Sequence, residues 1–495
     1  MKRAKAMTTD ASTIDGWISD AATRDPDKPA LIFDRERLSY GDMAKAVSQR
    51  ADDLRSGGIR RGDRIAWYGL NHPEVFVLLF ACARIGAMLV PLNWRLAAPE
   101  IATIVANCEP KLLFHDDHFA EEAKSITGPA ILPIGADVPP RNGNAGAEPP
   151  TIDDPILLVY TSGSTGTPKG AVLTQRALAC NAAMSVEAHG MNADDMGLVV
   201  LPLFHVGGLN ILPTPAFSVG ATIVLHERFD PAATCAALEE VTLAIMVPTV
   251  LQAVMATEGW DGADLSALRA MSIGSTDVPR ALIEAIHSRG VPLIQVYGAT
   301  ETAPFAIYQT VDDAMDTVGS IGRAGSRNSI RLVDGLRDVA VGEPGEILVK
   351  GDNVLSEYWR EPGQTAASLV DGWFHTGDVA TLDEHGQYWF TDRIKHIIIS
   401  GGENIYPTEI ERVLRDLPGI IEVAVVGRSD PKWGEIPVAV VVSDGNVTNE
   451  TVLAACDGRL ARYKHPKAVV FVDALPRNAT GKVVAAQVRE MIANP

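Results

Sequence analysis

Residues 160–170 of the sequence read Tyr160-Thr161-Ser162-Gly163-Ser164-Thr165-Gly166-Thr167-Pro168-Lys169-Gly170. The apolar run Ile156-Leu157-Leu158-Val159 precedes this stretch, and Ala171-Val172-Leu173 follows it. Short apolar runs that are bounded by glycine and proline are typical of buried strands. We therefore expect residues 160–170 to form a loop that joins two strands.

The composition of this loop indicates a phosphate site. It contains three glycines and five Ser/Thr hydroxyls, and Lys169 adds a positive charge. Glycine lets backbone N–H groups crowd together, and such a nest of N–H groups binds anions. The usual P-loop requires Gly-x4-Gly-Lys-Ser/Thr, whereas counting from Gly163 places Pro168 at the second glycine. The stretch thus predicts a phosphate loop of another kind, and the alternative is an ordinary Gly/Ser turn.

Length and charge limit the class of protein. A chain of 495 residues is too long for one typical core, so two or more domains are expected. A hydrophobic content of 46% is that of an ordinary globular protein. The net charge of −19 and a pI near 5.0 argue against nucleic acid as a main partner. An anionic substrate must therefore be met by local positive charge.

Cysteine usage and the longest apolar run bear on location. The five cysteines form no Cys-x-x-Cys pair, which fits a reducing cytosol better than a disulfide framework. The basic start of the chain is not followed by the apolar region of a secretory signal. The run Val75–Ala83 is too short to span a bilayer and is predicted to be a buried helix. We expect a cytoplasmic protein without a transmembrane segment.

Strand and helix patterns alternate along the chain. Strands are predicted at Ala30–Phe33 and Asp63–Tyr68, with a helix from Ser39 to about Gly57 between them. Ser39 with Asp42 resembles a capping box. Such alternation favours an α/β fold with a parallel sheet. Residues 128–153, rich in Pro, Gly and Asn, are predicted to be a surface loop within the fold.

The later part of the chain has a different pattern. Residues 343–360 are predicted to be hairpin strands of a β subdomain with a structural role. A helix is predicted from Thr408 to about Leu417, with Thr408 as its N-cap and Glu411 at its third position. Strand patterns follow it, so the C-terminal part is predicted to be a small α+β domain.

Further motifs follow the phosphate loop in a fixed order. They are Phe204-His205-Val206-Gly207-Gly208, Tyr297-Gly298-Ala299-Thr300-Glu301, Gly372-Trp373-Phe374-His375-Thr376-Gly377-Asp378, Asp392-Arg393-Ile394-Lys395 and Asn478-Ala479-Thr480-Gly481-Lys482. With these motifs the sequence resembles the adenylate-forming superfamily, which includes acyl- and aryl-CoA synthetases, luciferases and peptide-synthetase adenylation domains. The resemblance runs over roughly residues 15–490 and looks closest to fatty-acyl-CoA and feruloyl-type CoA synthetases.

The resemblance implies a large N-terminal domain, residues 1–394, that binds ATP and acid. Its sheets are of parallel type with helices, and it carries the β subdomain. A small mobile C-terminal domain, residues 395–495, would carry the catalytic lysine and the CoA loop, with Lys395 as the hinge.

The resemblance also implies an ATP/AMP site. Tyr297 would stack on adenine, Thr300 would contact the α-phosphate, and Asp378 and Arg393 would bind the ribose. Lys482, Glu301 and Thr165 would be catalytic, and Glu301 with Thr161 would hold Mg²⁺, which prefers oxygen ligands. The implied nucleotide-binding residues are Thr161, Ser162, Gly163, Ser164, Thr165, Gly166, Lys169, Ser275, Thr276, Tyr297, Gly298, Thr300, Asp378 and Arg393.

The acyl pocket and the CoA tunnel are implied in the same way. The implied pocket residues are His205, Val206, Gly207, Gly208, Gly274 and Ala299, and the implied tunnel residues are Ser400, Gly401, Gly402 and Glu403. No cationic residue stands out in the pocket segments, which disfavours a dicarboxylate such as malonate. A lone histidine is more often structural than catalytic, so the assignment of His205 to the pocket depends on the motif that contains it.

The activity that the resemblance implies is an AMP-forming acid–CoA ligase using ATP, Mg²⁺ and CoA. The acid would be fatty or aromatic, for example a hydroxycinnamate, and a homodimer is left open. One alternative is an adenylation enzyme that loads a separate carrier protein; peptide-synthetase domains usually place an aspartate where His205 stands. Another is a non-catalytic sensor of acyl groups or nucleotides, which the presence of Lys482, Glu301, Asp378 and Thr165 disfavours.

Overall fold

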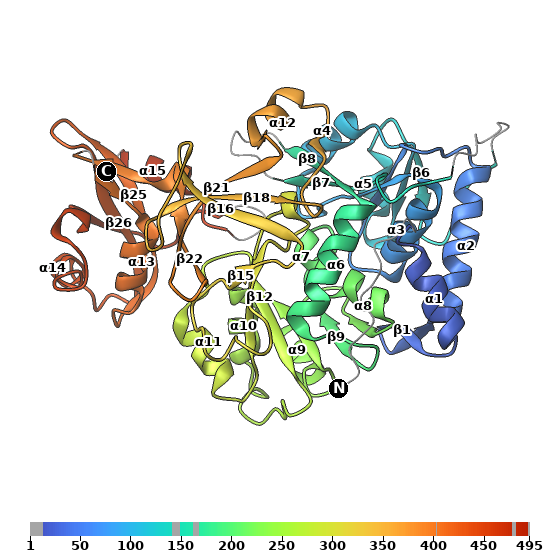
Figure 1. Ribbon diagram of the computed structural model, residues 1–495, viewed down its shortest axis with the longest axis horizontal. Helices are drawn as coiled ribbons and strands as arrows, with labels where there is room; N and C mark the ends of the chain where they lie inside the picture. The colour runs from blue at the N-terminus through green and yellow to red at the C-terminus, as the bar shows by residue number, and fades with distance from the viewer. Residues whose placement is uncertain (1–12, 141–148, 162–167, 402, 478–481, 494–495) are drawn as a thin grey trace. The chain divides into compact units, whose positions relative to one another are not determined.

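The computed structural model describes residues 13–140, 149–161, 168–401, 403–477 and 482–493 (Figure 1). The chain divides into two compact units. The first comprises Met1–Ile330 and Val349–Phe374, and the second comprises Arg331–Leu348 and His375–Pro495. The predicted class, α/β with a small α+β C-terminal part, is confirmed.

A seven-stranded sheet of the first unit carries the phosphate-loop motif at one end. Its order is β19-β8-β7-β4-β3-β5-β6, and the strands from β7 to β6 are parallel. Their bounds are β3 Arg64–Tyr68, β4 Met88–Pro91, β5 Leu112–His115, β6 Ala130–Pro133, β7 Pro155–Thr161, β8 Lys169–Thr174 and β19 Glu357–Tyr358. β7 and β8 pair antiparallel with Thr161 opposite Lys169, so the two predicted strands are confirmed, and residues 162–167 between them lie outside the described residues.

Two predictions about this sheet were wrong. The segment 128–153 is not all loop, because β6 lies within it and pairs with β5. Tyr358 does not belong to the β subdomain, because β19 pairs antiparallel with β8. Both strands are short and lack a clear alternating pattern, so only their partners define them.

A nine-stranded sheet forms the other half of the first unit. Its order is β15-β14-β13-β12-β11-β9-β10-β1-β2, and the six strands from β13 to β1 are parallel (Figure 1). Their bounds are β1 Pro29–Phe33, β2 Glu36–Ser39, β9 Met196–Val199, β10 Thr222–Leu225, β11 Leu243–Met246, β12 Ala270–Gly274, β13 Leu293–Tyr297, β14 Ile307–Tyr308 and β15 Arg323–Ala324. The expected parallel α/β sheet is confirmed.

The helices of this unit cover the two sheets. Ser39 caps α2, its hydroxyl accepting from the N–H of Asp42, and α3 is buried along nearly its whole length, both as predicted. The helices are α1 Gly16–Arg24, α2 Tyr40–Ser56, α3 Pro73–Ile85, α4 Ala98–Cys108, α5 Ala120–Lys124, α6 Gln175–His189, α7 Val206–Asn210, α8 Pro213–Val219, α9 Pro231–Ala237, α10 Pro248–Met255, α11 Arg280–His287 and α12 Pro362–Ser368, with 3-10 turns η1 Asp117–Phe119 and η2 Thr300–Thr302.

The predicted β subdomain is a six-stranded sheet of order β17-β16-β18-β21-β20, with β22 also paired to β21. Its strands are β16 Asn328–Asp334, β17 Arg337–Asp338, β18 Gly345–Gly351, β20 Leu369–Val370, β21 Trp373–Leu382 and β22 Tyr388–Arg393. The division between the two units passes through this sheet. Asp378 lies inside β21, which continues to Leu382.

The second unit also contains a five-stranded sheet with helices on both faces (Figure 1). Along β25 and β26, alternate residues pack on α13 and α14 or on α15, as the two-residue period of a strand requires. The elements are β23 Ile398–Ser400, β24 Glu403–Ile405, β25 Ile420–Asp430, β26 Gly434–Ser443, β27 Ala468–Phe471, α13 Pro407–Arg415, α14 Asn449–Ala454 and α15 Ala485–Ala493, with turns η3 Ile394–His396 and η4 Arg462–Lys464.

The predicted cap of α13 was wrong. The helix begins at Pro407, and Tyr406 rather than Thr408 is its N-cap residue. The fixed backbone angle of proline suits the first helical position. The N–H of Thr408 is instead taken by the carboxylate of Asp392 at 2.8 Å. A side chain 16 residues away thus does the work that was assigned to a local cap.

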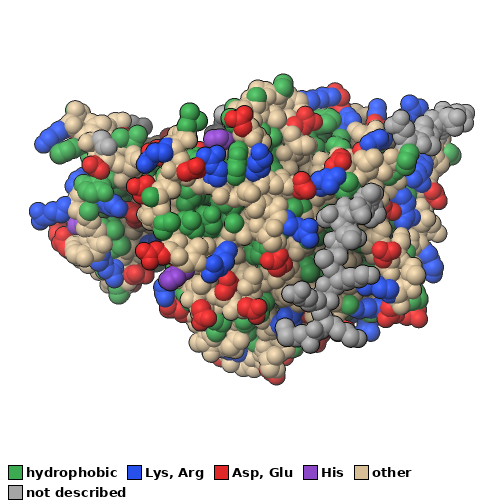
Figure 2. Space-filling model, in the orientation of Figure 1, with side chains coloured by type: hydrophobic (Ala, Val, Ile, Leu, Met, Phe, Trp, Pro, Cys, Tyr) green, Lys and Arg blue, Asp and Glu red, His purple; other side chains and the backbone are tan. Residues whose placement is uncertain are grey.

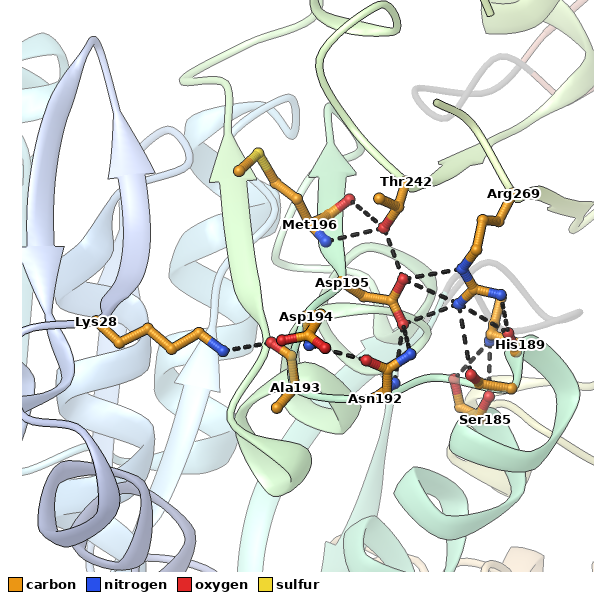
Figure 3. A network of polar contacts seen from close by, with 11 residues as sticks. Lys28, Ser185, His189, Asn192, Ala193, Asp194, Asp195, Met196, Thr242 and Arg269 are labelled. Atoms are coloured by element: carbon orange, nitrogen blue, oxygen red, sulfur yellow. Dashed lines mark hydrogen bonds and ion pairs between the residues drawn. The ribbon is translucent and has the colours of Figure 1, made fainter. Parts of the chain in front are cut away.

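An ion pair with a buried carboxylate joins the amino ends of strands of the nine-stranded sheet (Figure 3). Arg269 donates to Asp195, whose carboxylate is 3% exposed and also accepts from Thr242 and Asn192. These residues precede β12, β9 and β11 or lie in the turn after α6. Burial lowers the pKa of His189 to about 4, so its imidazole stays neutral near pH 7. The network stabilises this end of the sheet and leaves the opposite end for ligands.

Charged side chains of both signs are intermingled on the face shown in Figure 2. In the described ranges, no helix combines the length and the apolar character that a membrane span requires. All five cysteines are free and buried.

Candidate active site

Several predicted site segments follow the carboxyl ends of neighbouring parallel strands. Ser275 comes directly after β12, Gly298 after β13, and the His205 segment follows β9. Ligands of open α/β sheets bind at this edge, outside the carboxyl ends of the strands. The backbone of Ser275 has φ of +73°, which is unusual for a residue with a side chain. Such strain concentrates at functional sites, and Ser275 and Thr276 are both exposed there.

Glu301 and Lys169 are linked to one short segment of the first unit. The Tyr358 hydroxyl donates to Oε1 of Glu301 at 2.8 Å. The Lys169 ammonium donates to Oε1 of Gln364 at 2.6 Å. Thr161 lies opposite Lys169 across β7 and β8, and its hydroxyl contacts the Lys169 carbonyl at 3.5 Å. Ser162, Gly163, Ser164, Thr165 and Gly166 lie outside the described residues.

Three buried asparagines hold the turn that follows Glu301. Asn181 accepts from the N–H of Phe305 at 3.0 Å, and Asn210 donates to the carbonyl of Ala303 at 3.2 Å. Asn353 donates to the carbonyls of Thr302 and Phe305, at 3.1 and 2.7 Å. All three side chains are fully buried. Buried amides that satisfy backbone groups rigidify a turn. The three asparagines therefore hold in place the turn that directly follows the motif Tyr297–Glu301.

Packing accounts for three of the glycines in these motifs. A Cβ added to Gly298 would lie 1.6 Å from the Pro304 carbonyl oxygen, and one added to Gly274 would lie 2.3 Å from that of Val296. A Cβ on Gly208 would lie 2.3 Å from the Pro202 oxygen. Close approach of the chain to itself therefore already requires these glycines. Their contact with a ligand stays a prediction.

Gly207 differs from its neighbour. The nearest atom to a Cβ added there would be Ile211 Cδ1, at 4.0 Å. Gly207 therefore faces open space, which fits the predicted role in an acyl pocket. Val206 is buried and begins α7, and the half-buried Ala299 donates its N–H to the hydroxyl of Thr302.

Aromatic rings surround the His205 segment. The Phe204 ring lies 4.5 Å from the His205 ring and 6.2 Å from the Trp94 ring, measured between centroids. The Arg95 guanidinium lies over both Trp94 and Phe204, at 5.0 and 5.8 Å. A cation thus lies next to this segment. The lack of a cationic residue within the pocket motifs therefore no longer disfavours a dicarboxylate. Trp94 and Arg95 are distant in sequence from the pocket motifs, so sequence reasoning missed them.

The two residues predicted to bind ribose form an ion pair in the second unit. Asp378 in β21 and Arg393 in β22 lie directly opposite each other, with Arg393 Nε 3.0 Å from Asp378 Oδ1. Asp378 is 6% exposed, whereas the side chain of Arg393 is half exposed. The pair presents a carboxylate and a guanidinium together, which suits a vicinal diol.

Lys482 belongs to the same charged group. Burial lowers the pKa of its ammonium to about 8, repulsion from Arg393 and Lys395 acts in the same direction, and attraction to Asp378 opposes it. Although the Lys482 residue as a whole is exposed, its charged end lies among the other charges of this group, and repulsion from Arg393 adds to the effect of burial. Burial and then Arg393 also lower the pKa of Lys395. Four predicted residues from three separate segments are thereby brought together.

The predicted hinge residue is followed by a histidine–aspartate contact. His396 Nδ1 lies 3.6 Å from Oδ1 of Asp392, which is 2% exposed. The other oxygen of Asp392 accepts the N–H of Thr408 at the start of α13. Asp392 therefore ties the turn η3 to α13.

The predicted CoA segment is the tip of the β23–β24 hairpin. Ser400 pairs with Glu403, and Gly401 has φ of +62°. The Gly401 N–H donates to the Trp433 carbonyl at 2.8 Å, and a Cβ there would lie 2.8 Å from the indole ring. Trp433 is 46% exposed. Gly402 lies outside the described residues.

The donor set of the first unit fits magnesium. Glu301 has no Lys or Arg partner in the part of the chain that the structure describes, so its charge is available to a cation. In the same part, no cluster of three or more His, Cys, Asp or Glu could hold a metal by itself. Mg²⁺ commonly binds through one or two carboxylates and completes its octahedral shell with substrate phosphates and water.

Comparison with known proteins identifies the class. Residues 18–359 match the AMP-binding enzyme family, and residues 409–482 match the AMP-binding enzyme C-terminal domain. The chain belongs to the AMP-binding enzyme family, and the resemblance to adenylate-forming enzymes is confirmed.

Several relatives align over nearly the whole chain. The chain is 47% identical to an indoleacetate–CoA ligase of Aromatoleum aromaticum, with 96% of this chain and 98% of that protein covered. It is 40% identical to a feruloyl-CoA synthase of an Amycolatopsis species, with the same coverage. Among solved structures, the o-succinylbenzoate CoA synthetase MenE of Bacillus subtilis with its acyl-adenylate is 30% identical and superposes with a TM-score of 0.87, covering 97% of this chain and 98% of that one.

Adjacent glycines give a matched test of the pocket segment. Gly208→Ala should lower the free energy of unfolding by about 1–3 kcal/mol, because overpacking against the Pro202 carbonyl forces the backbone to move. Gly207→Ala should leave stability unchanged or slightly higher, because alanine favours the helix, and should shift acid selectivity toward smaller acids. Denaturant unfolding and kcat/KM for several acids measure both. Equal destabilisation by the two substitutions would contradict this geometry.

Proposed function

We propose that this protein is an ATP-dependent acid–CoA ligase that forms AMP. The observation that carries the proposal is the grouping of Lys482 with Asp378, Arg393 and Lys395, which the sequence scatters over more than 100 positions. Membership of the AMP-binding enzyme family supports the same activity. The reaction joins a carboxylic acid to CoA in two steps, through an acyl-adenylate.

The residues of the first unit would bind the triphosphate and the acid. Residues 161–166 with Lys169 would hold the phosphates, with Thr165 acting in catalysis, Tyr297 and Thr300 would contact adenine and the α-phosphate, and Ser275, Thr276 and Gly298 would line the nucleotide. Glu301, with Thr161, would hold Mg²⁺, which would offset negative charge on the phosphates. His205, Val206, Gly207, Gly208, Gly274 and Ala299 would line the acyl pocket.

The residues of the second unit would act on the reacting groups. Asp378 and Arg393 would bind the ribose hydroxyls. The carboxylate oxygen of the acid attacks the α-phosphorus and pyrophosphate leaves, and the Lys482 ammonium offsets the charge that builds up. Holding the two anions in line supplies roughly 7–11 kcal/mol of the barrier reduction at best.

The second step requires a different residue set. The CoA thiol attacks the acyl carbonyl of the adenylate, and AMP leaves. Ser400, Gly401, Gly402 and Glu403 would form the tunnel for the thiol arm. We propose that a C-terminal domain of residues 395–495 turns about Lys395, exchanging Lys482 for this hairpin.

For the acid, we propose an aromatic carboxylic acid, with a fatty acid as the second candidate. The aromatic rings of Trp94, Phe204 and His205 beside the open face of Gly207 support a planar substrate. Two relatives are named for indoleacetate and ferulate, and another, FadD13 of Mycobacterium tuberculosis, 36% identical, for long-chain fatty acids. We also propose a cytoplasmic location, which the five free cysteines favour, and leave a homodimer to sedimentation analysis.

An assay of AMP formation tests the proposed activity. With ATP and Mg²⁺, a panel of arylacetates, cinnamates, benzoates, fatty acids and malonate should give AMP and a CoA thioester with aromatic acids. Thioester from fatty acids alone would move the substrate to the second candidate. AMP formation that never yields a CoA thioester would favour loading of a carrier protein, and no activity with any acid would favour a sensor.

Replacement of Lys482 separates the two steps. Lys482→Ala should lower acid-dependent adenylation by on the order of 10²–10³-fold, as expected when one charge-stabilising donor is removed. Thioester formation from supplied acyl-adenylate should stay close to that of the unaltered protein, because the lysine has left the site in that step. Equal loss in both half-reactions would contradict the exchange of Lys482 for the hairpin.

The lowered pKa of Lys482 predicts the alkaline side of the pH profile. Because only the ammonium form offsets negative charge, kcat/KM for ATP should fall as the pH rises through about 8. The Lys482→Arg variant keeps its positive charge at all these pH values. Its kcat/KM for ATP should therefore fall only at higher pH, even where its maximal value is lower. An unaltered protein whose kcat/KM stays level to pH 10 would refute this assignment.

A further inference from the structure

Two side chains of one segment contact the charged groups that would face ATP. The segment comprises β19 and α12, from Glu357 to Ser368, and only its first part, up to residue 360, belongs to the stretch that was predicted from sequence to be structural. We propose that Tyr358 and Gln364 are positioning residues that hold Glu301 and Lys169 in place for Mg²⁺ and the triphosphate. This inference rests on the proposed function.

The segment is anchored directly to the strand that follows the phosphate loop. β19 pairs with β8, with Tyr358 opposite Ala171, and the Trp359 N–H donates to the Gly170 carbonyl at 2.7 Å. The Tyr358 N–H donates to the hydroxyl of Thr365 in α12 at 2.9 Å. These hydrogen bonds connect the strand, the turn and the helix to each other and to the start of β8.

Tyr358 fixes the carboxylate of Glu301. The tyrosine is 6% exposed, and its hydroxyl donates to Oε1 at 2.8 Å. The backbone of Glu301 is held as well, because its carbonyl accepts from the N–H of Leu355 at 2.8 Å. Among the described residues nothing donates to Oε2, which leaves that oxygen to a cation.

Gln364 holds the Lys169 ammonium without neutralising it. Its Oε1 accepts from the ammonium at 2.6 Å, while its Nε2 donates to the Ser368 hydroxyl at 2.9 Å. The second contact turns the amide so that its oxygen points to the lysine. A carboxylate here would pair with Lys169 and compete with a phosphate, whereas an amide positions the cation and keeps its full charge.

The two contacts predict different dependence on magnesium. Replacing a residue that orients a metal ligand without binding the metal itself typically lowers metal affinity by 10–100-fold. Tyr358→Phe should therefore weaken ATP binding about tenfold in Mg²⁺ and leave ATP binding in EDTA unchanged. Gln364→Glu should weaken ATP binding in both buffers, because Lys169 then pairs with the new carboxylate.

Calorimetric titration of the full chain with ATP, without acid or CoA, tests this inference. Tyr40→Phe is the matched control for Tyr358→Phe, because it also removes one buried hydroxyl, which donates to Ala221 at 2.6 Å. Ala366→Glu is the control for Gln364→Glu, because it adds the same charge at an exposed position of α12. Both controls should bind ATP as the unaltered protein does.

The outcomes are distinguishable. If Tyr358→Phe and Gln364→Glu both bind ATP like their controls while the unaltered protein forms AMP, the positioning role is wrong and the proposed function stands. If the unaltered protein binds no ATP in Mg²⁺, the proposed function itself fails. If Tyr358→Phe does not fold, the comparison of Gln364→Glu with its control Ala366→Glu still tests the inference. Equal ATP affinities of these two variants would overturn it.

Discussion

Electrostatic repulsion is the constraint that this protein has to overcome. A carboxylate and a triphosphate must approach each other in a chain whose own net charge is −19. Acidic and basic side chains are intermingled on the face seen in Figure 2. In the proposed site, positive charge comes from Lys169 in the first unit and from Arg393, Lys395 and Lys482 in the second.

Neighbouring residues determine the position or the charge of these cations. Lys169 is held by a neutral amide, which positions it at full charge. Arg393 is paired with Asp378, which limits repulsion within the cationic group. Burial lowers the pKa of Lys482 to about 8, and repulsion from Arg393 and Lys395 acts in the same direction. The charge of this lysine is therefore sensitive to pH just above neutrality.

The sequence predicted most of the local structure because its signals were local. The two strands that flank residues 162–167, the Ser39 cap and the individual strands of the parallel sheets each have signals in residues close together in the chain. The same is true of the motif order that identified the family. Predictions became wrong where a distant partner decides the structure. Thr408 donates to Asp392 instead of capping α13, and β19 has only two residues, so its partner β8 defines it.

The supporting contacts of the site could not be read from the sequence for the same reason. Asn181 and Phe305 are 124 positions apart, and Lys169 and Gln364 are 195 apart. No periodicity or spacing signals such pairs. The glycines show a related limit: the motifs indicated room for a ligand, yet at Gly298, Gly274 and Gly208 the chain's own carbonyls fill that space, whereas Gly207 faces an opening.

The central claim is that an acyl-adenylate forms before CoA takes part. Exchange of labelled pyrophosphate into ATP measures this step alone, because it requires reversible formation of the adenylate. The account predicts exchange that depends on the acid and on Mg²⁺ and proceeds without CoA. Exchange that occurs only when CoA is present, or that ignores the acid, would contradict it.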